Sequence, residues 1–205
     1  MGLPMDRPCQ SVGMSKGRLE AFTDGVIAIL ITIMVLELRP PEGSELSDLR
    51  PLVPTLLAYL LSFVMLAIYW NNHHHLFRVV EQVEGAVMWA NMALLFWLSL
   101  IPFGTAWTGE HPTDAAPVAI YGVAFLGAAL AYFVLTRALL RLHEPTSRLA
   151  IALGRDWKGK LSALAYLVAI PLAVVSTWLS LAIYVGVAIV WLVPDRRISR
   201  VVAEG

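Results

Sequence analysis

Residues 19–38 read LEAFTDGVIAILITIMVLEL, the first long apolar segment of the chain. Its charged residues, Glu20, Asp24 and Glu37, lie near its two ends, and everything from Gly25 to Leu36 is apolar or small except for one threonine. A helix of about 20 such residues spans the ~30 Å hydrocarbon core of a bilayer. Two prolines follow Arg39, and proline has no backbone N–H to continue a helix. The stretch therefore predicts a membrane-spanning helix.

The rest of the chain repeats this pattern. Hydrophobic residues make up 58% of the 205 residues and charged residues only 15%, against about 25% charged in an ordinary soluble domain. Further apolar spans are expected at 53–77, 87–107 and 117–140. The last apolar region, 161–193, is too long for one span, so we predict two short helices, 161–174 and 177–193, that turn near Ser176. The fold class is therefore all-α, a polytopic membrane protein with six transmembrane helices.

The distribution of positive charge predicts the orientation. With six spans, thirteen of the fifteen Lys and Arg residues lie on the side of the termini, and only Arg39 and Arg50 lie opposite. Loops rich in Lys and Arg stay in the cytoplasm, so both termini are predicted to be cytoplasmic. We expect a disordered tail at 1–15, a transmembrane domain at 16–200 and a short tail at 201–205.

Composition and missing motifs exclude several functions. A formal net charge of zero argues against a nucleic-acid partner, and one cysteine, Cys9, cannot form an internal disulfide or a cysteine-rich metal site. We find no nucleotide-binding loop, metalloprotease motif or hydrolase elbow. We therefore predict neither an enzyme nor a cofactor.

Polar residues inside spans are costly and mark candidate functional sites. Helices one, two and three carry such residues at one depth near the cytoplasmic side: Arg18, Thr23, Asp24, Asn71, Asn72, one or more of His73 to His75, and Asn91. Three interpretations are open: hydrogen bonds that hold the helices together, a proton pathway through the histidines, or a transition-metal site. Consecutive histidines are rotated about 100° apart on a helix, which weakens the metal interpretation.

The first span also carries a stripe of residues at helical spacing, Gly25, Ile29, Thr32 and Leu36. Such a stripe is typical of ordinary helix packing. The alternative is a pore wall, in which aliphatic rings form a constriction and threonine hydroxyls offer ligands to an ion.

The motifs of several spans together resemble one family. Arg18-Leu-Glu-Ala-Phe22-Thr23-Asp24 is similar to the Arg-x-x-x-Phe-Ser-Asp signature of the transmembrane protein 175 family of potassium channels, in its prokaryotic single-repeat form. Thr23 replaces the usual serine and keeps the hydroxyl. The resemblance continues through Trp70-Asn-Asn-His-His-His, Asn91, Ser99-Leu-Ile-Pro-Phe103 and the segment from Trp178 to Arg197, and covers roughly 16–200.

The resemblance implies a homotetramer in the plasma membrane of a prokaryote, with a central potassium pore lined by the first helix of each subunit. The expected partners are the lipid bilayer and potassium ions. Ile29 would form the constriction, Thr32 a hydroxyl layer and Leu36 a further aliphatic ring. The resemblance also implies a packing network whose expected members are Arg18, Phe22, Thr23, Asp24, His74, His75 and Asn91. Here His75 or His74 is preferred over His73.

Two other functions stay open at this point. One is a proton-conducting channel that uses Asp24 and the cluster His73 to His75, since family members are associated with proton flux. The other is a membrane scaffold that does not conduct. A secondary transporter is disfavoured because the chain has no matching halves with broken helices.

Overall fold

The computed structural model of the chain describes residues 15–80, 82–144, 147 and 157–192. Within these ranges the regular structure is helical. In chain order the elements are α1 (Lys16–Leu36), the 3-10 helix η1 (Leu46–Leu52), α2 (Val53–Arg78), α3 (Gly85–Ser99), α4 (Ile101–Glu110), α5 (Ala115–Leu142), α7 (Trp157–Leu172) and α8 (Thr177–Leu192). Apart from Ser15, the tails predicted at 1–15 and 201–205 lie outside the described residues.

The predicted spans are confirmed as helices, with one difference. The third span is two helices, α3 and α4, because Pro102 cannot donate the hydrogen bond that a continuous helix needs at that point. The backbone N–H of Leu100 bonds to the Trp97 carbonyl, and that of Gly104 to the Leu100 carbonyl, so the two pieces still form one nearly continuous rod. The four segments Lys16–Leu36, Leu46–Arg78, Gly85–Glu110 and Ala115–Leu142 are each long and apolar enough to cross a membrane.

The last two helices are shorter. Helices α7 and α8 have 16 residues each, or about 24 Å of helix, and they form the hairpin predicted from the sequence. The backbone N–H groups of Val174, Val175 and Ser176 in the turn all bond to carbonyls of the preceding turn. These donors are therefore satisfied within the protein and need no water. Backbone groups in contact with lipid must be satisfied in this way.

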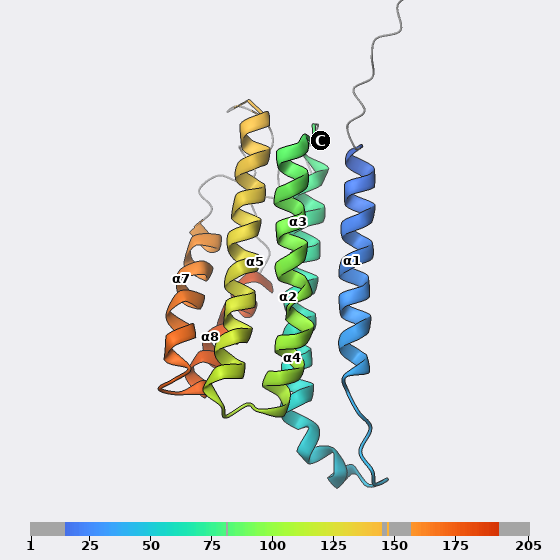
Figure 1. The fold of residues 1–205 in the computed structure, drawn as a ribbon, viewed down its shortest axis with the longest axis vertical. Helices are drawn as coiled ribbons and strands as arrows, with labels where there is room; N and C mark the ends of the chain where they lie inside the picture. The colour runs from blue at the N-terminus through green and yellow to red at the C-terminus, as the bar shows by residue number, and fades with distance from the viewer. Residues whose placement is uncertain (1–14, 81, 145–146, 148–156, 193–205) are drawn as a thin grey trace, which may run out of the picture.

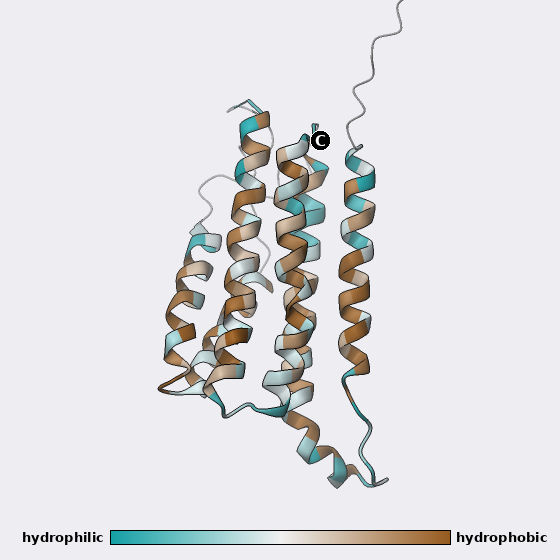
Figure 2. Ribbon diagram, in the orientation of Figure 1, coloured by the Kyte–Doolittle hydropathy of each residue, from teal (hydrophilic) through white to brown (hydrophobic). Residues whose placement is uncertain are grey.

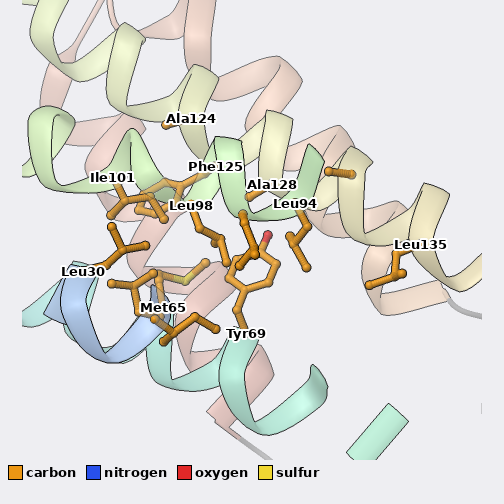
Figure 3. Close-up of a cluster of buried hydrophobic side chains, with 14 of the residues drawn as sticks. Leu30, Met65, Tyr69, Leu94, Leu98, Ile101, Ala124, Phe125, Ala128 and Leu135 are labelled. Carbon is orange, nitrogen blue, oxygen red and sulfur yellow. The ribbon is translucent and has the colours of Figure 1, made fainter. Parts of the chain in front are cut away.

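Helix α5 lies inside the bundle and contacts α3, α4, α7 and α8, whereas the main contacts of α1 are with α2, α3 and α4. Figure 1 shows α1 at one edge of the bundle and α7 at the opposite edge. Side chains from α1, α2, α3 and α5 converge in one apolar core, which includes Leu30, Met65, Leu98 and Phe125 (Figure 3).

Close helix contacts depend on small residues, as is usual in membrane bundles. At Gly127 of α5, an added Cβ atom would overlap the ring of Trp97 on α3. At Gly122, one turn and a half earlier, it would overlap the hydroxyl of Tyr184 on α8. Both glycines thus let large aromatic side chains lie directly against the α5 backbone.

The outer surface of the bundle is strongly apolar. Brown, hydrophobic positions cover the middle of the helices, and teal positions gather at their ends (Figure 2). Large exposed apolar side chains include Phe96 on α3, Leu130 on α5 and Leu167 on α7. Such a surface fits a lipid environment or contacts with further subunits.

Candidate pore-lining helix and its polar anchor

Helix α1 has two chemically distinct faces. Its buried residues recur every three or four positions and pack on α2, α3 and α4: Leu19, Thr23, Ile27, Leu30 and Met34. The predicted pore stripe lies on the opposite side of the helix and is exposed in the single chain. Ile29 is 57% exposed and Leu36 is 77% exposed. The stripe is therefore not used for packing within this chain.

Thr32 is exposed on the same face, and its hydroxyl has a defined direction. The hydroxyl Oγ1 donates to the backbone carbonyl of Ile29 at 2.9 Å. Because the proton points back along the helix, the oxygen lone pairs are left to face outward. The group can therefore accept a hydrogen bond or act as an oxygen ligand for a cation.

A buried hydrogen-bonded chain fixes the N-terminal part of α1 to α3 and α2. The Asn91 side chain on α3 donates through Nδ2 to Thr23 Oγ1 at 2.8 Å. Its amide oxygen Oδ1 pairs with His73 Nε2 at 2.9 Å, which requires the histidine proton on Nε2 because a carbonyl oxygen only accepts. All three residues are fully buried. We call Thr23, Asn91 and His73 the polar anchor.

Two further contacts hold α1 beside α2. Trp70 Nε1 on α2 donates to Asp24 Oδ1 at 2.9 Å, so the carboxylate of the signature has a partner on the neighbouring helix. Lys16 Nζ, at the start of α1, donates to the Val80 carbonyl at 2.9 Å, just past the end of α2. Neither contact was expected from the sequence, although Trp70 belongs to the motif that continues through the three histidines. Trp70 could have been found from its spacing, since it lies three residues before His73 on the same helix.

The histidine of the polar anchor differs from the sequence-based expectation. His73 takes the position for which His74 or His75 was preferred. Its neighbours Leu66, Tyr69, Leu76 and Phe77 are buried, so the inward face of α2 runs through position 73. His73 also stacks on Phe77 with ring centroids 4.3 Å apart.

The two other histidines turn away from the polar anchor, because each successive residue is rotated by about 100°. His74 is exposed and stacks on Trp70, with ring centroids 6.0 Å apart. His75 Nδ1 is buried and has no hydrogen-bond partner among the described residues. No group of three or more metal-ligating side chains occurs in the part of the chain that the structure describes.

Two more predicted network members, both on α1, are not joined to the polar anchor. The Arg18 side chain is exposed and makes no hydrogen bond or ion pair with the described residues. Phe22 is 50% exposed. Both lie on the same broad side of α1 as Ile29. Within one chain, Thr23 of the signature therefore points inward, whereas Arg18 and Phe22 point outward.

Taken together, the helical bundle, its apolar surface and the outward face of α1 define a polytopic α-helical membrane protein. Comparisons with known proteins give the family. The family model described as "Endosomal/lysosomal potassium channel TMEM175" matches residues 18–102. A protein of Chryseobacterium sp. (strain P1-3), named as a potassium channel, is 46% identical over 191 residues, which cover 93% of this chain and 100% of that protein. The chain therefore belongs to the TMEM175 family.

A solved structure supports the same assignment. The crystal structure of a lysosomal potassium-selective channel TMEM175 homolog from Chamaesiphon minutus is 33% identical, with a TM-score of 0.73 over 86% of this chain and 96% of that one. A more distant relative, named as the endosomal/lysosomal proton channel TMEM175 of Danio rerio, is 25% identical over 63% of this chain and 25% of that protein.

Proposed function

We propose that this chain is a potassium channel in the plasma membrane of a prokaryote, and that four copies place α1 around a shared central pore. The relatives support potassium as the conducted ion. The bacterial relative and the solved homolog are both named as potassium channels, and together with the family model they cover nearly the whole described chain. The proposal includes no catalytic step and no bound cofactor.

The observation that carries the pore assignment is the unpartnered face of α1. From Gly25 to Leu36 this face is aliphatic or small except for Thr32, and α1 lies at the edge of the bundle (Figure 1). One helix at an edge cannot enclose a pore, so several copies must contribute one helix each. Homotetramer formation would bring the Ile29, Thr32 and Leu36 side chains of the copies together as successive rings.

The chemistry of these rings fits a gate and a moderate filter. Ile29 and Leu36 side chains resist hydration, so a narrow ring of them blocks ions until α1 moves. Thr32 supplies outward lone pairs between them. Potassium loses its hydration shell at lower cost than sodium. A few hydroxyl oxygens together with ordered water would compensate for the lost hydration of potassium. Four hydroxyls are fewer ligands than stacked carbonyl rings offer, so we expect moderate selectivity.

The polar anchor explains how the cytoplasmic end of α1 keeps its orientation. An aliphatic helix facing other copies has no strong rotational preference of its own. The hydrogen bonds that Trp70 donates to Asp24 and Asn91 donates to Thr23 fix the rotation of α1 against α2 and α3. With the buried face of α1 held against α2 and α3, the opposite face of the helix turns toward the pore.

Proton conduction is the second candidate, because vertebrate relatives are named as proton channels and the polar anchor contains a histidine. One chemical argument weighs against a relay through this route. The middle member is an amide, Asn91, which donates and accepts but does not exchange its proton readily along a chain. The anchor is better suited to holding helices than to moving protons.

Flux measurements on reconstituted protein test the proposal. Liposomes would be given separate potassium, sodium and proton gradients, and Ile29→Ala would be compared with Ile189→Ala. The two isoleucines are equally exposed, 57% each, but Ile189 lies on α8. We expect potassium flux to exceed sodium flux and to rise several-fold with Ile29→Ala only. Flux that follows the proton gradient without potassium would favour the second candidate, and equal responses of the two variants would remove α1 from the pore.

A further inference from the structure

A recess between four helices lies away from α1 and has no part in the proposed pore. It has a volume of about 40 Å³ and is bounded by α2, α5, α7 and α8, toward the ends of these helices that are predicted to be cytoplasmic. Its walls are apolar and aromatic, and include Met65, Ile68, Phe133, Tyr166 and Trp191. The space suits the end of an apolar group better than a fully hydrated ion.

Two cations lie over aromatic rings that form the wall of this recess. The Arg137 guanidinium sits 5.0 Å from the centroid of the Phe133 ring, and Lys158 Nζ sits 5.9 Å from the Trp191 ring. Both rings line the recess, and each has a positive charge over it. The recess therefore combines an apolar interior with a cationic border, which is the complement of an anionic amphiphile.

The wall next to Lys158 is held rigidly. Trp191 Nε1 donates to Ser162 Oγ at 2.8 Å, and Ser162 Oγ donates to the Lys158 carbonyl at 2.8 Å. These bonds tie α8 to the first turns of α7. The N-terminus of α7 also lies at this border, since Gly159 lines the recess, and a helix N-terminus carries partial positive charge.

The position of the recess matches the lipid side of the molecule. Helix α7 lies at the opposite edge of the bundle from α1 (Figure 1). If α1 faces the central axis of an oligomer, α7 faces the surrounding bilayer. The recess lies near the membrane face that carries most Lys and Arg residues, where phospholipid headgroups are within reach of both cations.

We propose that this recess binds an anionic phospholipid of the cytoplasmic leaflet, with the phosphate between Arg137 and Lys158 and the start of an acyl chain against the aromatic wall. The site lies next to the polar anchor through α2. Asn72 lines the recess and is adjacent in sequence to His73, while Tyr69 lines it next to Trp70. One short segment of α2 thus borders both the lipid site and the contacts that hold α1.

Native mass spectrometry of the purified full-length protein tests this site. Delipidated protein would be titrated with dioleoyl phosphatidylglycerol or with dioleoyl phosphatidylcholine. The double variant Arg137→Gln/Lys158→Gln is expected to weaken phosphatidylglycerol binding by about tenfold or more, since each cation near a membrane surface contributes measurably to anionic lipid binding. Phosphatidylcholine binding should not change.

The chain offers a matched control, Arg141→Gln/Lys160→Gln. These cations lie on the same two helices and are exposed, but neither lines the recess nor contacts one of its rings. We expect this variant to bind like the wild type. Equal losses in the two double variants would show general attraction to a charged surface, and no loss in either would show that the recess binds no lipid; both results overturn the proposal.

Two further arms separate the site from folding and from simple phosphate binding. Arg137→Lys/Lys158→Arg keeps both charges and should bind phosphatidylglycerol like the wild type, whereas a loss in this variant would overturn recognition by charge. Excess sn-glycerol 3-phosphate, a headgroup without chains, should not displace the lipid. Displacement would identify a phosphate site rather than a lipid site. None of these readouts requires ion conduction, so they stand apart from the flux test of the channel.

Discussion

At the scale of single residues, Asn91 has the most consequential position in the described chain. It is the only residue of the polar anchor that bonds to two other helices, since its amide joins Thr23 of α1 to His73 of α2. Removing it leaves a buried hydroxyl and a buried imidazole without this partner. An unsatisfied buried polar group is far more costly than a lost surface hydrogen bond.

We therefore expect Asn91→Leu to lower the free energy of unfolding by roughly 1–3 kcal/mol. The measurement is the thermal unfolding midpoint of the detergent-purified protein. Asn71→Leu is the control, because Asn71 is exposed on α2 and should shift stability by no more than about 0.5 kcal/mol. Similar midpoints for the two variants would show that the anchor contributes little.

Thr32 is the residue that the proposed filter depends on. Thr32→Ala removes its oxygen from the exposed face of α1, so the potassium-to-sodium permeability ratio is expected to fall toward unity while conduction persists. Thr32→Ser keeps the oxygen and should keep most of the selectivity. Bi-ionic flux measurements in liposomes give both ratios. A ratio that is unaffected by alanine would place the filter at another layer.

The histidine cluster shows why residue-level prediction has limits. The sequence placed polar residues of three helices at one depth, and the structure joins Thr23, Asn91 and a histidine there. The preference for His74 or His75 over His73 was wrong. Three adjacent positions differ only by rotation, and the rotation of α2 follows from its packing on the rest of the bundle rather than from local sequence. The burial of Leu66 and Phe77 supplies the missing information.

At the scale of elements, hydropathy alone predicts the helices well. The predicted first span, 19–38, differs from α1, Lys16–Leu36, by a few residues at each end, and the predicted hairpin of two short helices is present. The division of the third span into α3 and α4 was not expected. Apolar composition continues across Pro102, so hydropathy carries no sign of the break, although proline itself is a recognised helix breaker.

Helix α5 supplies a prediction about packing. Gly127→Ala would push a methyl group into the Trp97 ring, so we expect a loss of roughly 1–3 kcal/mol in stability. Gly186→Ala on α8 is the matched control, because nothing lies within 4 Å of the added atom. Alanine has the higher helix propensity, so this control should be neutral or stabilise by up to about 1 kcal/mol. Thermal unfolding compares the two; equal effects would contradict close α3–α5 packing.

At the scale of the whole molecule, the orientation in the membrane is still a prediction. It rests on the thirteen Lys and Arg residues assigned to one side. The helices alternate in direction, so Ser47 of η1 and Ser147, beyond the end of α5, belong to opposite faces of the bundle. These two serines therefore report on orientation.

In a Cys9→Ser background, Ser47→Cys is expected to react with a membrane-impermeant maleimide on intact cells. Ser147→Cys should react only after the cells are permeabilised. The extent of labelling is measured by the mass shift of the purified protein. The reverse pattern would invert the orientation, and labelling of both sites in intact cells would contradict an odd number of spans between them.

The direction of one hydroxyl has a consequence for the charge of the permeating ion. The Thr32 proton is engaged by the Ile29 carbonyl, so a ring of these residues would present lone pairs and no hydrogen-bond donors. Chloride needs donors to replace its water, and the aliphatic neighbours of Thr32 offer none. In the proposed pore an anion would therefore lose its hydration at the Thr32 layer without compensation, whereas a cation would be coordinated there. The pore would then reject anions without any fixed negative charge.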